Sequence, residues 1–156
     1  MRGTILLHAL ASAPLFAAAQ ATAMTGPFTI FFDAGSSRIT RQHAGILDNF
    51  LAVIRHHPDN LTVVIEAGAD RVGTPESNRR LSCARGRAVA RYLVEHGVRS
   101  ARIEVHGYGE DRPLADGPDE SADPQNRYVA MFEREDPLYS PEDRDNAPPA
   151  VDRTRC

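Results

Sequence analysis

Apolar and polar residues follow two spacings along this chain, and the spacings predict four strands and two helices. Runs of β-branched and aromatic residues predict strands at residues 28–32, 61–65, 102–105 and 127–132. Between the first two strands, apolar residues recur every three or four positions, which indicates a helix. Thr40 can cap the start of this helix, and Pro58 requires it to end earlier.

A second, longer helix is predicted between the second and third strands. Thr74 is its expected cap, Pro75 fits its first turn, and Gly97 is a typical residue just beyond a helix end. A loop rich in Asp, Pro and Gly is expected over residues 107–124. Strands that alternate with long helices predict an α/β fold of the α+β sandwich type, with the order βαβαββ.

The two ends of the chain have compositions unlike the middle. Residues 1–23 combine an early Arg2 with an apolar, Ala-rich run and small-x-small cleavage sites, which is typical of a secretory signal peptide. Residues 133–156 are acidic, Arg-rich and Pro-rich with little to bury, so we expect a disordered tail. Residues 24–132 are then left as one folded domain.

Charge narrows the classes of partner. The formal net charge is −3, which gives no electrostatic reason to expect nucleic acid or an anionic membrane surface as a ligand. All 18 basic residues are arginines, whose planar forks suit carboxylates. No stretch supplies the many alternating ten-residue strands of an outer-membrane barrel, so we do not expect a membrane-spanning barrel.

The second helix carries two stripes of residues at helical spacing. One is predicted to be the apolar seam and contains Leu81, Ala84, Ala88 and Tyr92. The other begins polar and ends apolar, with Asn78, Ser82, Arg85 and Val89. The spacing alone leaves open whether the polar half binds a ligand or only caps and solvates the start of the helix.

Several motifs in this region resemble the OmpA C-terminal-like, peptidoglycan-binding domain family. Asp70-Arg71-Val72-Gly73, Asn78 and Leu81-Ser82-Cys83-Ala84-Arg85 resemble its pattern D-x-x-G-x4-N-x-x-L-S-x-x-R-A. Gly107-Tyr108-Gly109-Glu110 and Asn126-Arg127-Tyr128-Val129 also fit, and together the matches cover about residues 28–132. The resemblance implies one mixed sheet packed against two long helices.

The resemblance also implies a function: non-catalytic binding of peptidoglycan through the diaminopimelate of its stem peptide. Diaminopimelate presents an ammonium and a carboxylate on one carbon, so its receptor needs an anion and a forked cation. The family pattern assigns these roles to Asp70 and Arg85, which we expect to face solvent in the empty pocket. Further ligand-binding candidates are Asn78, the backbone near Ala69 and Leu81, and, more weakly, Arg127. An exported protein of this kind is expected in the periplasm, associated with the outer membrane.

Three departures from the family pattern lie near these residues. Ala67-Gly68-Ala69 precedes Asp70 where the family usually reads G-H-T, Gly86 replaces an alanine, and Tyr128 stands where a second Arg is common. An alternative function is therefore a structural or interaction paralogue that has weakened or lost peptidoglycan binding and contacts another envelope protein.

Other chemistry finds little support in the sequence. No spacing typical of a zinc site, a nucleophile elbow or a dinucleotide fingerprint is present, so we expect no metal, no cofactor and no enzymatic activity. In an oxidising compartment we expect Cys83 and Cys156 to form a disulfide; the alternatives are that they stay free or that Cys156 pairs between molecules. The helical position of Cys83 predicts a thiol that is at least partly accessible.

Overall fold

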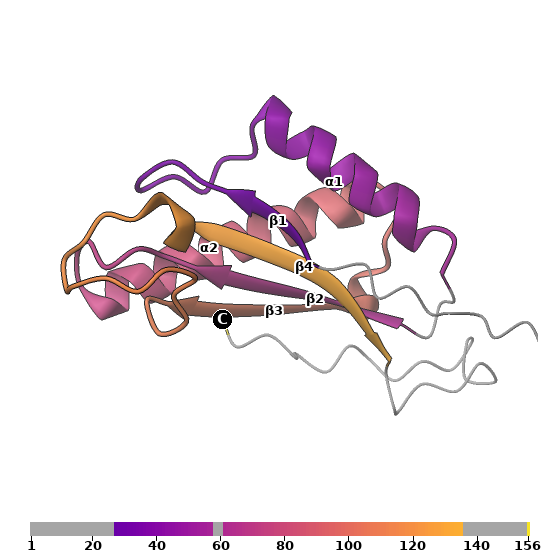
Figure 1. The fold of residues 1–156 in the computed structure, drawn as a ribbon. Coiled ribbons are helices and arrows are strands. Elements are labelled where there is room, and N and C mark those ends of the chain that lie inside the picture. The colour runs from indigo at the N-terminus through magenta and orange to yellow at the C-terminus, as the bar shows by residue number, and fades with distance from the viewer. Residues whose placement is uncertain (1–26, 58–60, 136–155) are drawn as a thin grey trace, which may run out of the picture.

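The computed structural model describes residues 27–57, 61–135 and 156. Within these residues a sheet is covered on one face by two helices (Figure 1). The elements follow in the order β1 (Phe28–Phe31), α1 (Arg41–Ile54), β2 (Leu61–Gly68), α2 (Pro75–Glu95), β3 (Ile103–Gly109) and β4 (Tyr128–Glu135). Two short 3-10 turns, η1 (Ser100–Arg102) and η2 (Pro124–Asn126), precede β3 and β4. The predicted fold and element order are confirmed.

The C-terminal strand lies inside the sheet, whose order is β1-β4-β2-β3. β4 is antiparallel to both β1 and β2, whereas β2 and β3 are parallel and joined by α2. β1, β2 and β3 therefore point the same way, and the loops that follow them gather at one end of the sheet (Figure 1). β4 begins at that same end. This topology brings four distant chain segments together.

Threonine caps fix the start of both helices. The Thr40 hydroxyl accepts a hydrogen bond from the backbone N–H of His43 at 3.2 Å, and the Thr74 hydroxyl accepts one from Ser77 at the same distance. At the end of α2, Gly97 has a φ of +98°, a conformation that glycine adopts without strain. Both predicted caps and the terminal glycine are confirmed.

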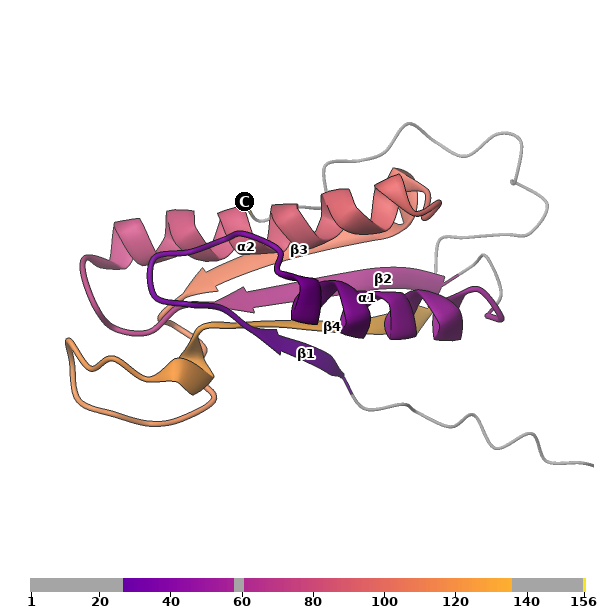
Figure 2. The same cartoon turned by 90° about the horizontal axis from the view of Figure 1, so that it is seen from above.

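The core lies between the sheet and the helices. α1 contributes apolar side chains such as Leu47 and Leu51, and α2 contributes Val89 and Leu93. α2 lies along β2 and β3, and α1 along β1 (Figure 2). No helix in the described ranges is long and apolar enough to cross a membrane.

The buried stripe of α2 differs from the predicted seam. Ala84 is exposed, whereas Ser82 and Arg85 of the other stripe are fully buried. The sheet meets α2 at Gly86, where an added Cβ would lie 2.6 Å from a methyl group of Val105. The polar stripe therefore lies against the strands, whereas in the predicted seam Ala88 is buried and Leu81 and Tyr92 are half-buried.

Three strands continue beyond their predicted ends, and β2 reaches Gly68 instead of residue 65. β3 continues to Gly109 because its glycines stay in register with β2, although a loop was predicted from Gly107. β4 continues to Glu135, so the tail boundary at residue 133 is wrong. The Glu133 carboxylate pairs with Arg102 at 3.3 Å and with His57, which anchors that end of the strand. The predicted signal peptide and residues 136–155 of the predicted tail lie outside the described residues.

Candidate ligand-binding site

The predicted ligand residues meet at the end of the sheet where the three loops gather. Asp70 follows β2, Arg85 projects from α2, and Arg127 lies directly before β4. The segment after β1 closes the site from the other side, through the carbonyl oxygens of Phe32, Asp33 and Ser36. The site therefore combines segments separated by up to about one hundred residues of sequence.

Arg85 is the most enclosed member of the site, with an exposed fraction of 0%. Its guanidinium donates to three backbone carbonyls, those of Ser36 at 2.9 Å, Gly68 at 3.0 Å and Asp33 at 3.1 Å. The ring of Phe32 lies 5.4 Å from its Cζ atom. Burial lowers the pKa of Arg85 to about 10, and the nearby Asp70 carboxylate opposes this shift.

Asp70 is also buried, with an exposed fraction of 5%. One of its carboxylate oxygens accepts a hydrogen bond from Nη1 of Arg127 at 3.0 Å. The Nε–H of Arg127 donates to the carbonyl of Phe32 at 2.9 Å. A single anion thus lies beside two cations, Arg127 in direct contact and Arg85 through its electrostatic field.

The expectation that Asp70 and Arg85 face solvent is wrong. The sequence did not predict that the β1–α1 loop belongs to the site. Carbonyl oxygens of this loop enclose the Arg85 guanidinium. Arg127, the weaker candidate, is the residue that contacts Asp70 directly.

Asn78 and Ser82 hold the end of β3 against α2. The Asn78 amide donates to the Glu110 carboxylate at 2.6 Å, and the Ser82 hydroxyl accepts from the backbone N–H of Gly109 at 2.9 Å. Glu110 was not among the predicted ligand residues, although it belongs to the Gly107-Tyr108-Gly109-Glu110 motif. Asn78 is buried, so its amide is already engaged within the protein.

The backbone N–H of Ala69 is engaged as well, because it donates to the carbonyl of Gly109 at 2.7 Å. It is therefore not free to bind a ligand in this conformation. Leu81 lies half-buried on α2. Of the predicted set, the charged side chains of Asp70, Arg85 and Arg127 are the ones that the structure brings together.

These contacts suit an amphoteric ligand. A guanidinium has five N–H donors, and three of those of Arg85 already bind protein carbonyls. Among the described residues, no further hydrogen-bond partner is found for the other two donors or for the second carboxylate oxygen of Asp70. Within the described residues, no group of three metal-ligating side chains is found.

Comparison with known proteins decides the family. Residues 31–127 match the OmpA family. The chain belongs to the OmpA family. A peptidoglycan-associated lipoprotein of Pseudomonas putida is 38% identical over 103 residues, which are 66% of this chain and 61% of that protein. The chain thus spans about three fifths of that relative's length.

Solved structures show the same fold. The crystal structure of the peptidoglycan-associated lipoprotein from Burkholderia pseudomallei is 30% identical and has a TM-score of 0.60, covering 68% of this chain and 89% of that chain. The C-terminal domain of Helicobacter pylori MotB also has a TM-score of 0.60, covering 71% of this chain and 85% of that chain. At 24% identity, the MotB likeness shows the fold alone.

A disulfide joins α2 of this OmpA-family domain to the last residue of the chain. The Cα atoms of Cys83 and Cys156 lie 5.4 Å apart, and Arg87 donates to the backbone oxygen of Cys156 at 2.8 Å. Gly107 makes room for the bridge, because a Cβ there would lie 2.5 Å from the Cys83 sulfur. The expectation that Cys83 is partly accessible is wrong, since it is 6% exposed between α2 and β3.

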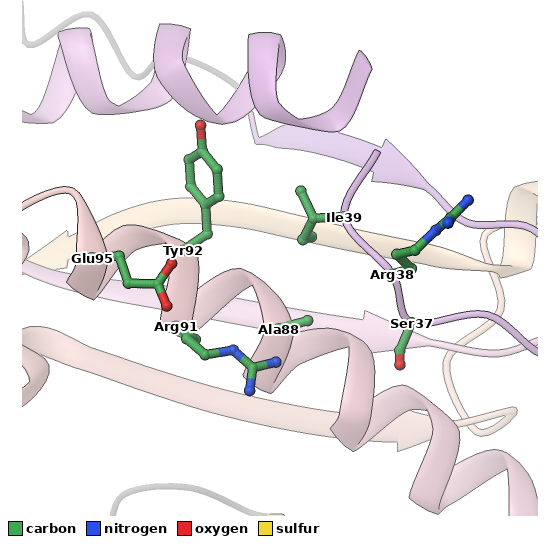
Figure 3. A pocket seen from close by; sticks show the side chains of 7 residues that line it. All are labelled: Ser37, Arg38, Ile39, Ala88, Arg91, Tyr92 and Glu95. Carbon is green, nitrogen blue, oxygen red and sulfur yellow. The ribbon is translucent and has the colours of Figure 1, made fainter. Parts of the chain in front are cut away.

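Two cavities of the OmpA-family domain lie outside the charged cluster. One, of about 280 Å³, lies between the loop at residues 37–39 and the second half of α2 (Figure 3). The other, of about 200 Å³, lies near the C-terminal ends of both helices. The first begins one residue beyond Ser36, whose carbonyl accepts from Arg85.

Proposed function

We propose that this OmpA-family domain binds peptidoglycan in the cell envelope, without catalysis, through the diaminopimelate of the stem peptide. The observation that carries the proposal is the buried Asp70 carboxylate set between Arg127 and Arg85. Its relatives support it, because the P. putida and B. pseudomallei proteins are named peptidoglycan-associated lipoproteins.

Each charged group has a role in this proposal. Asp70 receives the ammonium of diaminopimelate, and the two remaining donors of Arg85 receive the carboxylate on the same carbon. Arg127 orients the Asp70 carboxylate by its 3.0 Å hydrogen bond. Charge-assisted hydrogen bonds of this kind contribute roughly 1.5–3 kcal/mol each. Asn78 and Ser82 fix the surrounding backbone, and Leu81 and Ala69 line the rim.

The proposed location follows from the same relatives. Relatives named for the outer membrane, such as outer membrane porin F of Pseudomonas aeruginosa, are 37% identical over 86 residues. We propose that the chain is exported by residues 1–23 and acts in the periplasm, in association with the outer membrane.

Co-sedimentation of the purified mature protein with peptidoglycan sacculi tests the proposal. Binding is expected to diaminopimelate-type sacculi and to be competed by free diaminopimelate but not by Nα-acetyl-lysine amide, whose ε-carbon carries an ammonium without a carboxylate. Asp70→Asn keeps the shape of the side chain and removes its charge, so it should reduce binding at least about tenfold. Arg91→Gln is the matched control, an exposed arginine on α2 with no ion pair in the described part of the chain.

A second candidate is an interaction paralogue that has lost this ligand and contacts another envelope protein. The engaged N–H of Ala69 and the complete burial of Arg85 favour it, because both leave less of the site open. Wild-type protein that stays in the supernatant with every type of sacculus would establish this alternative and overturn the first proposal.

A further inference from the structure

Tyr128 fills the space in which the side chain of residue 68 would lie. A Cβ built on Gly68 would be 2.8 Å from Cδ1 of Tyr128, closer still to Cε1, and 3.0 Å from the carbonyl oxygen of Asn126. Tyr128 itself is 3% exposed, so its ring is packed and not free to swing away. Glycine is therefore the residue that this ring permits at position 68.

The backbone of Gly68 forms part of the charged site. Its carbonyl oxygen accepts a hydrogen bond from Nη1 of Arg85, and Asp70 follows two residues later. The pairing of β2 with β3 becomes irregular at this point, since Ala67 lies opposite Gly107 but Gly68 lies opposite Gly109. The Gly68 carbonyl therefore lies where the strand register changes, with no side chain of its own to hold it.

Tyr128 is anchored at its far end. Its hydroxyl donates to the carbonyl oxygen of Arg112 at 3.0 Å, and the Arg112 guanidinium pairs with Glu66 at 3.1 Å. That guanidinium also lies 4.0 Å from the centre of the Tyr108 ring. The ring of Tyr128 is thus held between this exposed network and the backbone of Gly68.

Two neighbouring residues, one directly before β4 and one at its start, consequently act on the two members of the charged pair, one by direct contact and one through the backbone of Gly68. Arg127 contacts Asp70 directly, and Tyr128 contacts Gly68, whose carbonyl binds Arg85. We propose that Tyr128 is a positioning residue that holds the Gly68 carbonyl against the Arg85 guanidinium and so sets the spacing between Arg85 and Asp70. The Tyr128 ring fills the space that a side chain at position 68 would occupy, and this packing determines the spacing. The ligand named in this inference rests on the proposed function, whereas the contact between Tyr128 and Gly68 does not.

The same contact links two departures from the family pattern. Positions 68 and 128 usually carry His and Arg in that pattern, and here both differ. A side chain at position 68 and the packed ring at position 128 would require the same volume.

The test uses Tyr128→Ala, Tyr128→Phe, Gly68→Ala and the double variant Gly68→Ala/Tyr128→Ala. Tyr128→Ala should weaken sacculus binding about tenfold at a temperature where the variant is folded, whereas Tyr128→Phe keeps the ring and should stay within about twofold of wild type. Tyr92→Ala is the control, because the Tyr92 hydroxyl binds Asp48 on α1, away from the site.

The Nη1–H signal of Arg85 in NMR spectra, whose proton binds the Gly68 carbonyl, provides a readout that general destabilisation does not move. It should shift in unbound Tyr128→Ala and keep its position in Tyr128→Phe and Tyr92→Ala. Melting temperatures should also show coupling: Gly68→Ala should cost clearly less stability beside alanine than beside tyrosine, although the close contact with the Asn126 carbonyl remains in both.

An unchanged Arg85 signal in Tyr128→Ala, or an equal effect of Gly68→Ala in both backgrounds, would overturn the inference. If the wild-type protein does not bind sacculi, the proposed function is overturned instead. The Arg85 signal and the coupling between positions 68 and 128 in melting temperature then still decide the role of Tyr128.

Discussion

Replacing Arg85 with methionine removes the buried guanidinium while keeping most of its volume. The three carbonyl oxygens that it binds then lose their donor. Those of Asp33 and Ser36 lie in an exposed or half-exposed loop and can turn to water, but Gly68 is buried. An unsatisfied buried carbonyl costs about 1–3 kcal/mol.

Two further effects act in opposite directions on the same variant. The loss of the charge-assisted bonds and of the loop closure that they provide destabilises the fold, whereas removal of a buried charge restores part of the free energy of unfolding. We expect a net loss of about 2–4 kcal/mol, which for a domain of this size lowers the melting temperature by about 10–20 °C.

Thermal unfolding followed by circular dichroism measures this loss. Arg91→Met is the control, since Arg91 is exposed on the same helix, and its melting temperature should change by less than about 3 °C. A melting temperature for Arg85→Met as close to wild type as that of the control would refute the reasoning, because it would mean that the three carbonyls do not depend on Arg85.

Three other predictions test the packing and the cysteines. Gly86→Ala should destabilise the domain by about 1–2 kcal/mol in urea unfolding, because its Cβ would collide with a β3 methyl group, whereas Gly45→Ala on α1 has open space and should stabilise it by about 0.5–1 kcal/mol. Equal effects of the two substitutions would contradict the close approach of α2 to the sheet. Denatured protein exported to the periplasm should contain no free thiol, and Cys83→Ser should release one from Cys156; two free thiols in the wild type would exclude the bridge. Burial raises the pKa of Tyr128, so the unfolded chain ionises first and stability should fall as the pH rises above about 10; ultraviolet titration in which every tyrosine ionises at the free value would contradict this.

Much of the fold could be predicted because local signals agreed with the overall arrangement. Thr40 and Thr74 mark helix starts by a side chain that can bond to a backbone N–H three residues away, and such a contact is visible in sequence. Strand ends were less accurate, since the continuation of β3 through Gly107 and Gly109 depends on pairing with β2. The register between two strands depends on two distant segments of the chain, so the sequence of one strand does not reveal where the pairing ends.

The sequence predicted which residues form the site better than it predicted how they are arranged. Motif spacing pointed to Asp70 and Arg85, but their burial depends on the carbonyls of a loop about fifty residues before Arg85. The contact of Arg127 with Asp70 likewise joins positions 57 residues apart. A helical pattern also cannot tell which of two adjacent stripes faces the sheet when the buried stripe contains an arginine, and this is why Arg85 was expected at the surface.

Titration of the mature domain with soluble stem peptides tests the central claim most directly. One peptide contains diaminopimelate and the other contains lysine in its place, so the two differ by a single carboxylate at the carbon that Asp70 and Arg85 are proposed to bind. Isothermal titration calorimetry should show at least about tenfold tighter binding of the diaminopimelate peptide, and Asp70→Asn should remove that preference. Equal affinities for the two peptides, or a preference that survives Asp70→Asn, would contradict recognition by the Asp70–Arg85 pair.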